Sequence, residues 1–423
     1  MKHSLFLSFA LGAGWLLSPE SLVIAGNAAG QMGWMALPVL ASIALLFTVC
    51  GKLIHSPQVT TTKQKEQLML QSMIGKIPAT GISLAAVVPL LVLAATALLV
   101  TSGYTFNEVF LYWFPNFGFS FLLLALLTIL QFFSDKIIFR AQICFVSIAA
   151  GGLLILSLYG LASTEVHVSQ LFNQPGSFSS TSSAILLLLF VGSSATGFSN
   201  EKRPPSLLLP VAGFILFSSW ILVSLAYVNP ERLASSTIPY MTAARKIMGD
   251  PGRQIMGMVV ISGTCAAITG LMLICRRTLC DIAGIASENF ISCKKLRWGF
   301  PALIAIITGI SMATGLAGKE LLEVILRGAL ILWLLRYALL CLAAVAQIKK
   351  KSKAIPVPAA VCTFFLMAAL FSLILSNPHR SEMLNFLISM LGISGLLATI
   401  WFFVSRNVNA SKPANFQQME KNV

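Results

Sequence analysis

Apolar stretches of about 20 residues recur along almost the whole chain, and this feature constrains the fold more than any other. A helix needs about 20 apolar residues to cross a bilayer core of roughly 30 Å. We therefore predict an all-α membrane protein of about twelve transmembrane helices, and not a β-barrel, whose strands give alternating segments of about ten residues. The predicted spans cover residues 4–29, 33–51, 78–101, 115–133, 138–160, 182–199, 207–228, 254–275, 298–316, 321–346, 355–376 and 383–405.

Composition excludes a soluble domain, because 57% of the 423 residues are hydrophobic, only 10% are charged, and the mean hydropathy is +0.85. The net charge of +15 is first a topology signal and indicates no nucleic-acid partner. With Met1 in the cytoplasm, 21 of the 29 lysines and arginines fall in the predicted inside segments. We therefore expect a multi-pass protein of a bacterial inner membrane with both termini cytoplasmic, and a cleavable signal peptide at the start is the alternative.

Two predicted spans, the first and the sixth, contain clusters of small residues at equal positions in successive groups of five. Interrupted segments at matching places in two halves are typical of inverted-repeat transporters. Glycine tolerates the conformations that unwind a helix, although membrane helices also use glycine for close packing. The expected helix breaks are at Gly12, Gly14, Gly192 and Gly197.

This pattern predicts two five-helix repeats, 1–160 and the inverted 182–346, followed by two further transmembrane helices at 355–405 and a cytoplasmic tail at 406–423. Backbone N–H and C=O groups freed by a break can bind the carboxylate and ammonium of a small zwitterion. The spans contain no enzyme motif such as H-E-x-x-H, and the eight cysteines have no metal-ligand spacing, so we expect neither an enzyme nor a cofactor.

These small-residue spans make the chain resemble the amino acid-polyamine-organocation superfamily of permeases over roughly residues 5–350. The first span resembles that family's G-[SA]-G-I-F-x-x-P pattern, and Phe190 and Gly192 resemble its F-x-G motif. The resemblance implies a LeuT-like fold with a substrate between the first and sixth spans, and the uncharged pocket candidates favour a neutral amino acid over other amines. The substrate-binding residues it implies are Ala13, Gly14, Trp15, Leu188, Phe190, Gly192 and Ser193.

The sequence departs from that family where ion coupling is concerned. Ser194 stands where many members have a glutamate, and the fifth span lacks the lysine of some proton-coupled members. Coupling to H⁺ or Na⁺ therefore stays open, with Ser262 and Thr264 as weak candidates for a sodium site beside the first span.

Ionisable residues inside spans are functional candidates, because burying an unpaired charge in a membrane is costly. Glu20 lies six residues beyond Gly14, where it could bind a proton or a cation or act in gating, or form a structural ion pair. Arg327 follows Glu323 by four residues, so the two side chains can pair on one helix face. Arg336 has no local acid and must find a distant partner, such as Glu20, or an anionic substrate group.

The preferred function is a secondary active transporter of amino acids or related amines, working by symport or antiport as a monomer or homodimer in contact with membrane lipid. The alternative is a polytopic sensor or assembly partner that keeps the fold and does not transport.

Overall fold

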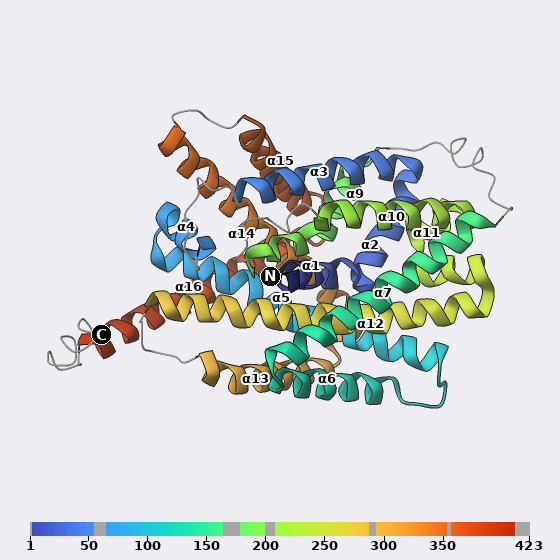
Figure 1. Cartoon of the computed structure of the whole chain (residues 1–423), viewed down its shortest axis with the longest axis horizontal. Helices are drawn as coiled ribbons and strands as arrows, with labels where there is room; N and C mark the ends of the chain where they lie inside the picture. Colours follow the sequence, from blue (N-terminus) through green and yellow to red (C-terminus); the bar gives the residue numbers. More distant parts are fainter. Residues whose placement is uncertain are drawn as a thin grey trace.

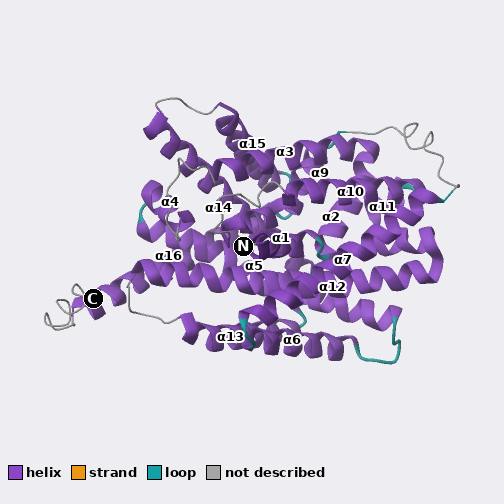
Figure 2. Cartoon of the chain, in the orientation of Figure 1, coloured by secondary structure: helices purple, strands orange, loops and turns teal. Residues whose placement is uncertain are grey.

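The computed structural model describes residues 2–54, 65–163, 178–198, 208–286, 293–352 and 357–410. Helices are the only regular elements in these ranges (Figure 2). They are α1 (Lys2–Leu16), α2 (Pro19–Met32), η1 (Gly33–Met35), α3 (Ala36–Ile54), α4 (Lys65–Ile74), α5 (Lys76–Val109), α6 (Asn116–Phe132), α7 (Asp135–Ala162), α9 (Ser180–Leu186), η2 (Leu187–Phe198), α10 (Leu208–Tyr227), α11 (Pro230–Ser235), α12 (Pro239–Ala286), α13 (Cys293–Ala313), η4 (Leu316–Gly318), α14 (Glu320–Ser352), α15 (Val357–Leu375) and α16 (Arg380–Ala410).

The prediction of an all-helical, multi-span membrane protein is confirmed. Within the described ranges, seven helical segments are long and apolar enough to cross a membrane, and four shorter apolar helices accompany them. The seven segments are Pro19–Ile54, Lys76–Val109, Asp135–Ala162, Leu208–Tyr227, Pro239–Ala283, Glu320–Lys349 and Arg380–Ser405.

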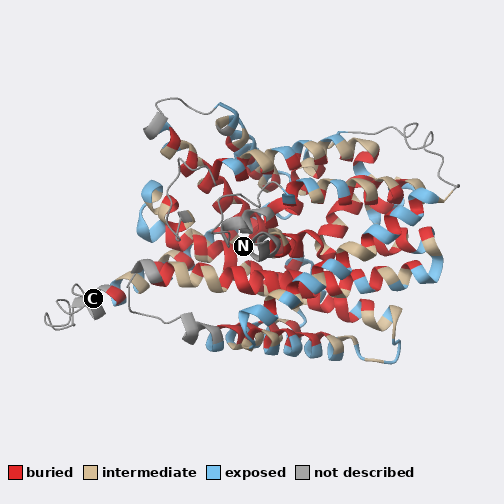
Figure 3. Ribbon diagram, in the orientation of Figure 1, coloured by how far each residue is buried: buried red, intermediate tan, exposed pale blue. Residues whose placement is uncertain are grey.

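The helices form a central group and a peripheral group. Of the most apolar window of α12, 89% of the residues are buried, against 17% for α16, so α12 lies at the centre and α16 at the edge. Figure 3 shows buried residues concentrated along α1, α5 and α12. In Figure 1, α6 and α13 lie together on one side of this centre, and α3 and α15 lie together on the opposite side.

The peripheral helices expose large apolar side chains. Phe364 and Phe371 of α15 and Leu396 and Phe403 of α16 are each more than half exposed. In water such a surface would be a liability, whereas a bilayer is the solvent that such side chains prefer. The outer helices therefore present their apolar faces to lipid, and the central helices are left to form the functional site.

Candidate functional site

The first predicted span is interrupted, and the interruption lies between α1 and α2. Ser18 is extended (φ −66°, ψ 153°), and its hydroxyl accepts a hydrogen bond from the backbone N–H of Ser21 at 3.3 Å, which caps the start of α2. Pro19 follows at the first helical position, where its missing N–H costs nothing and its fixed φ suits a helix start. The Ser21 hydroxyl donates to the Trp15 carbonyl at 2.8 Å, which uses one of the carbonyls freed by the break.

The predicted break at Gly12 and Gly14 is therefore wrong in position, because α1 runs through both residues to Leu16. These glycines permit close packing instead. A Cβ on Gly12 would lie 2.9 Å from the Gly192 carbonyl oxygen, and one on Gly192 would lie 2.7 Å from that of Gly12. A Cβ on Gly14 would lie 2.6 Å from the Ala266 carbonyl oxygen. The glycines thus let α1 cross η2 and α12 at backbone contact.

The sixth predicted span is irregular, since α9 continues as the 3₁₀ helix η2 over twelve residues. Runs of 3₁₀ helix longer than three or four residues are uncommon and often mark a hinge. The Trp15 indole N–H donates to the Leu188 carbonyl at 3.0 Å, which ties α1 to η2. Gly197, Ser193 and Ser194 fall in the part of η2 whose side chains lie outside the described residues.

The residues predicted to bind substrate do meet where α1 crosses η2. Ala13, Trp15, Leu188 and Phe190 are each at most 2% exposed. They pack in the hydrophobic core. These four residues therefore lie in the buried contact between α1 and η2. None of their side chains lines the cavity described in the next paragraph.

A cavity of about 720 Å³ lies beyond the break, on the side that the charge distribution predicts to face away from the cytoplasm. We call it the outer cavity. Its walls come from α2, the end of α5, α9, the segment around α11, the start of α12 and the start of α14. Its charged lining residues are Glu20, Glu108, Glu323 and Arg327.

The charges in the outer cavity do not cancel. Arg327 forms an ion pair with Glu323 on the same helix, which confirms the predicted pairing. Glu20 takes part in no hydrogen bond or ion pair with another described residue, and the side chain of Glu108 is likewise unpaired among them. The lining thus holds three acidic side chains and one basic side chain, and an excess of acidic groups in a cleft attracts cations.

Tyr240 also lines the outer cavity, near the start of α12. Its side chain is 1% exposed, and its hydroxyl has no hydrogen-bond partner in the described part of the chain. A buried hydroxyl without a partner costs free energy, so it calls for water or a ligand in the cavity. Nothing in the sequence pattern pointed to this tyrosine.

The residues proposed for a sodium site have other partners. Ser262 donates to the Met258 carbonyl of its own helix at 2.5 Å. Thr264 accepts from Ser102 of α5 at 2.7 Å. The junction of α12 with α1 is instead bridged by an amide of α7. The Gln142 Nε2 group donates to the carbonyls of Ala10 and Ala266, at 2.9 and 3.0 Å.

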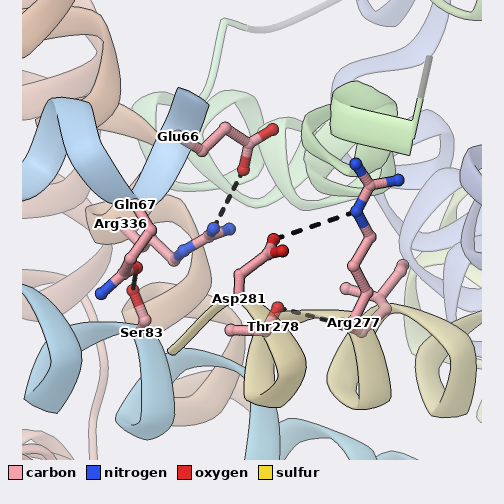
Figure 4. Close-up of polar contacts among 8 residues, drawn as sticks. Glu66, Gln67, Ser83, Arg277, Thr278, Asp281 and Arg336 are labelled. Atoms are coloured by element: carbon pink, nitrogen blue, oxygen red, sulfur yellow. Dashed lines mark hydrogen bonds and ion pairs between the residues drawn. The ribbon is translucent and has the colours of Figure 1, made fainter. Parts of the chain in front are cut away.

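Arg336 does not pair with Glu20. It is 6% exposed and forms an ion pair with Glu66 of α4 at 2.9 Å, as Figure 4 shows. Sequence reasoning missed Glu66, because residues 52–77 read as a loop and the two residues are 270 positions apart. The short amphipathic pattern of α4, with Leu, Met and Ile at helical spacing, was the available signal.

The acidic and hydroxyl side chains of the outer cavity offer oxygen atoms to a cation, and Met241 adds a thioether sulfur to the lining. In the described ranges, no three histidine, cysteine, aspartate or glutamate side chains come together as a metal-binding group. Carboxylates and hydroxyls suit hard cations such as Mg²⁺, Ca²⁺ and Mn²⁺. The arrangement can attract a hydrated cation to Glu20 without fixing it in a closed protein cage.

No protein-family model and no curated protein matches the chain, but solved structures do. The chain is similar to the Eremococcus coleocola manganese transporter in complex with an aromatic bis-isothiourea substituted compound. The identity is 13%, the TM-score is 0.57, and 95% of this chain and 94% of that chain are covered. A histidine-to-alanine variant of that transporter gives 14% identity and a TM-score of 0.56, with 94% and 93% covered.

This likeness corrects the interpretation of the sequence. It extends over nearly the full chain, and the similar protein is a manganese transporter. The likeness therefore overturns the resemblance to amino acid-polyamine-organocation permeases and the amino acid or amine substrate that it implied. At this identity the likeness establishes the fold, and the substrate has to be argued from the site.

Proposed function

We propose that this protein is a secondary transporter of a small inorganic cation, with divalent metal ions as the favoured class. It works by alternating access around the interruption between α1 and α2. The finer architecture belongs to the same proposal: about twelve membrane crossings, two five-helix repeats of inverted orientation and both termini in the cytoplasm.

The observation that carries the proposal is the position of Glu20. It lies in the first turn of α2, directly after the capped break, and lines the outer cavity. A helix N-terminus favours a negative charge, and no described side chain forms an ion pair with this carboxylate. An unpaired carboxylate at a helix break, open to an aqueous cavity, is a binding group for a cation.

Oxygen chemistry supports the class of cation. The outer cavity offers the carboxylates of Glu20 and Glu108 and the free hydroxyl of Tyr240. Such a set lacks the thiolates and imidazoles that hold zinc or copper tightly. A divalent ion that keeps part of its water shell fits both the size of the cavity and the low number of protein ligands, and weak binding suits a substrate that must be released. The proposal takes its favoured ion, Mn²⁺, from the similar transporter.

Uptake into proteoliposomes tests the proposal. We expect saturable entry of Mn²⁺ above the level of protein-free vesicles, measured with a trapped manganese-sensitive dye under an imposed inside-negative potential. Mg²⁺, Ca²⁺, Na⁺ and K⁺ serve as competitors, and a pH gradient and a sodium gradient are imposed separately to identify the coupling ion. If Mn²⁺ does not enter, and no radioactive tracer of the other four cations enters either, although the reconstituted protein shows a cooperative thermal transition, the proposed function is wrong.

Tyr240→Phe gives a second test within the outer cavity. Because the hydroxyl has no described partner, its removal should leave the thermal unfolding temperature unchanged or slightly raised. If the hydroxyl holds a water of the bound cation, the KM for uptake should rise about fivefold to tenfold, the value of one hydrogen bond of about 1 kcal/mol or more. An unchanged KM in a stable variant would remove Tyr240 from the site.

A further inference from the structure

The short helix α4 is fastened to α5 by buried contacts. Met69 and Leu70 are fully buried, and Gln67 is 3% exposed. The Ser83 hydroxyl donates to the Gln67 side-chain oxygen at 2.8 Å, and the Gln67 nitrogen donates to the Thr80 hydroxyl at 3.4 Å. An apolar ridge and one satisfied amide therefore hold α4 over the beginning of α5.

A charge pair fastens α4 to a second helix. Glu66 of α4 binds Arg336 of α14 at 2.9 Å, and the two side chains are 20% and 7% exposed. Figure 4 shows Asp281 of α12 between this pair and Arg277, with which Asp281 pairs at 3.9 Å. Four charged side chains from α4, α12 and α14 thus gather in one place, and loss of Glu66 would take away the ion-pair partner of the buried Arg336.

This cluster lies at the opposite end of α5 from the outer cavity. Ser83 contacts α4, whereas Thr105 lines the cavity. The 22 residue steps from Ser83 to Thr105 along the helix span roughly 33 Å, about the thickness of a bilayer core. The contacts of α4 therefore close the face away from the cavity.

The same turn of α14 reaches the irregular helix η2. Tyr337, next to Arg336, stacks on Phe47 of α3, with ring centroids 5.4 Å apart and an angle of 12°. Phe47 in turn lies 6.0 Å from Phe190 of η2. A movement of α14 that separates Arg336 from α4 would therefore also act on the helix that crosses α1.

We propose that the Glu66–Arg336 pair is an inner latch. It holds α4 against α14 while the outer cavity is open, and it must separate before the opposite face can open. The inference rests on the proposed transport function for its purpose, but the conformational change that it describes can be measured without any substrate.

Glu66→Gln tests the latch in the full-length protein in nanodiscs. A cysteine placed by Thr101→Cys in the outer cavity reports its accessibility to a water-soluble maleimide, with the chain that lacks this substitution as the background for the native cysteines. We expect labelling about tenfold slower in Glu66→Gln, because loss of the pair shifts the population away from the outward-open state. Hydrogen exchange of the amides in α4 should become faster in the same variant.

Two further variants make the result decisive. Glu66→Gln combined with Arg336→Met removes the orphan charge, so it should show the same shift in accessibility even if the single variant folds poorly. Glu382→Gln is the matched control, because it removes a carboxylate whose partner, His379, lies only three residues before it and on no other helix. Its labelling and exchange rates should equal those of the parent.

The two readouts separate a latch from a merely structural contact. Faster exchange in α4 with unchanged labelling of the outer cysteine would mean that the pair only stabilises α4, and the latch would be refuted. A shift in both without any cation uptake would leave the latch standing and overturn the proposed function. If the parent protein takes up cations but neither readout shifts in the variants, the latch is refuted and the proposed function stands.

Discussion

Replacing Glu20 with glutamine is expected to reduce the initial rate of cation uptake by about two to three orders of magnitude. Glutamine keeps the size and one oxygen of the side chain but removes its charge. A carboxylate facing a cation at close range contributes roughly 3–4 kcal/mol at the effective dielectric constant of a protein surface, and about 1.4 kcal/mol corresponds to a factor of ten. The measurement is the initial rate of Mn²⁺ entry into proteoliposomes as a function of Mn²⁺ concentration.

Folding of this variant should be intact. Glu20 makes no ion pair or hydrogen bond with another described residue, so its neutralisation breaks no contact and costs only the favourable term of about 0.3–1 kcal/mol with the α2 dipole. Glu231→Gln is the matched control, since Glu231 is an exposed carboxylate at the start of α11 and does not line the cavity. A wild-type KM and maximal rate in Glu20→Gln would show that Glu20 is not a binding group. The proposed function would then lose the observation on which it rests.

The helical framework could be predicted because it depends on local composition alone. An apolar run in lipid is stable as a helix, because a helix satisfies its own backbone hydrogen bonds, and each predicted span overlaps helix in the described part of the chain. The position of the break in the first span could also have been predicted. Ser18, Pro19 and Glu20 form a helix-start signature of cap, proline and acid, which is a more specific signal than two glycines.

The role of the glycines could not be predicted, because it depends on the neighbouring backbone. Gly12 and Gly192 have the same sequence pattern whether they unwind a helix or let two helices touch, and only the crossing of α1 with η2 distinguishes the two. The partner of Arg336 could not be predicted for a similar reason, because Glu66 is far from it in the sequence and only the fold brings the two together. Motifs of small residues thus identified a helix-crossing architecture, and the substrate inferred from them was wrong.

Gly263→Ala is expected to have the second large effect, because Gly263 of α12 faces the break itself. A Cβ at this position would lie 2.2 Å from the Leu17 carbonyl oxygen and 3.2 Å from the Leu17 carbonyl carbon. Neither atom belongs to a flexible side chain, so α12 or the break must move. We expect a loss of about 3 kcal/mol, at the upper end of overpacking costs, seen as a lower thermal unfolding temperature in detergent. Uptake should fall in the protein that still folds.

Gly151→Ala is the matched comparison, because this glycine lies in the middle of α7 and a Cβ there would meet no atom within 4 Å. Alanine in a helix interior should then be neutral or stabilising by about 0.5–1 kcal/mol. Equal unfolding temperatures for the two variants would mean that α12 can withdraw from Leu17 at no cost. In that case the short interruption between α1 and α2 is not held in place by α12, and the hydrogen bonds of Ser18 and Ser21 would have to position Glu20 alone.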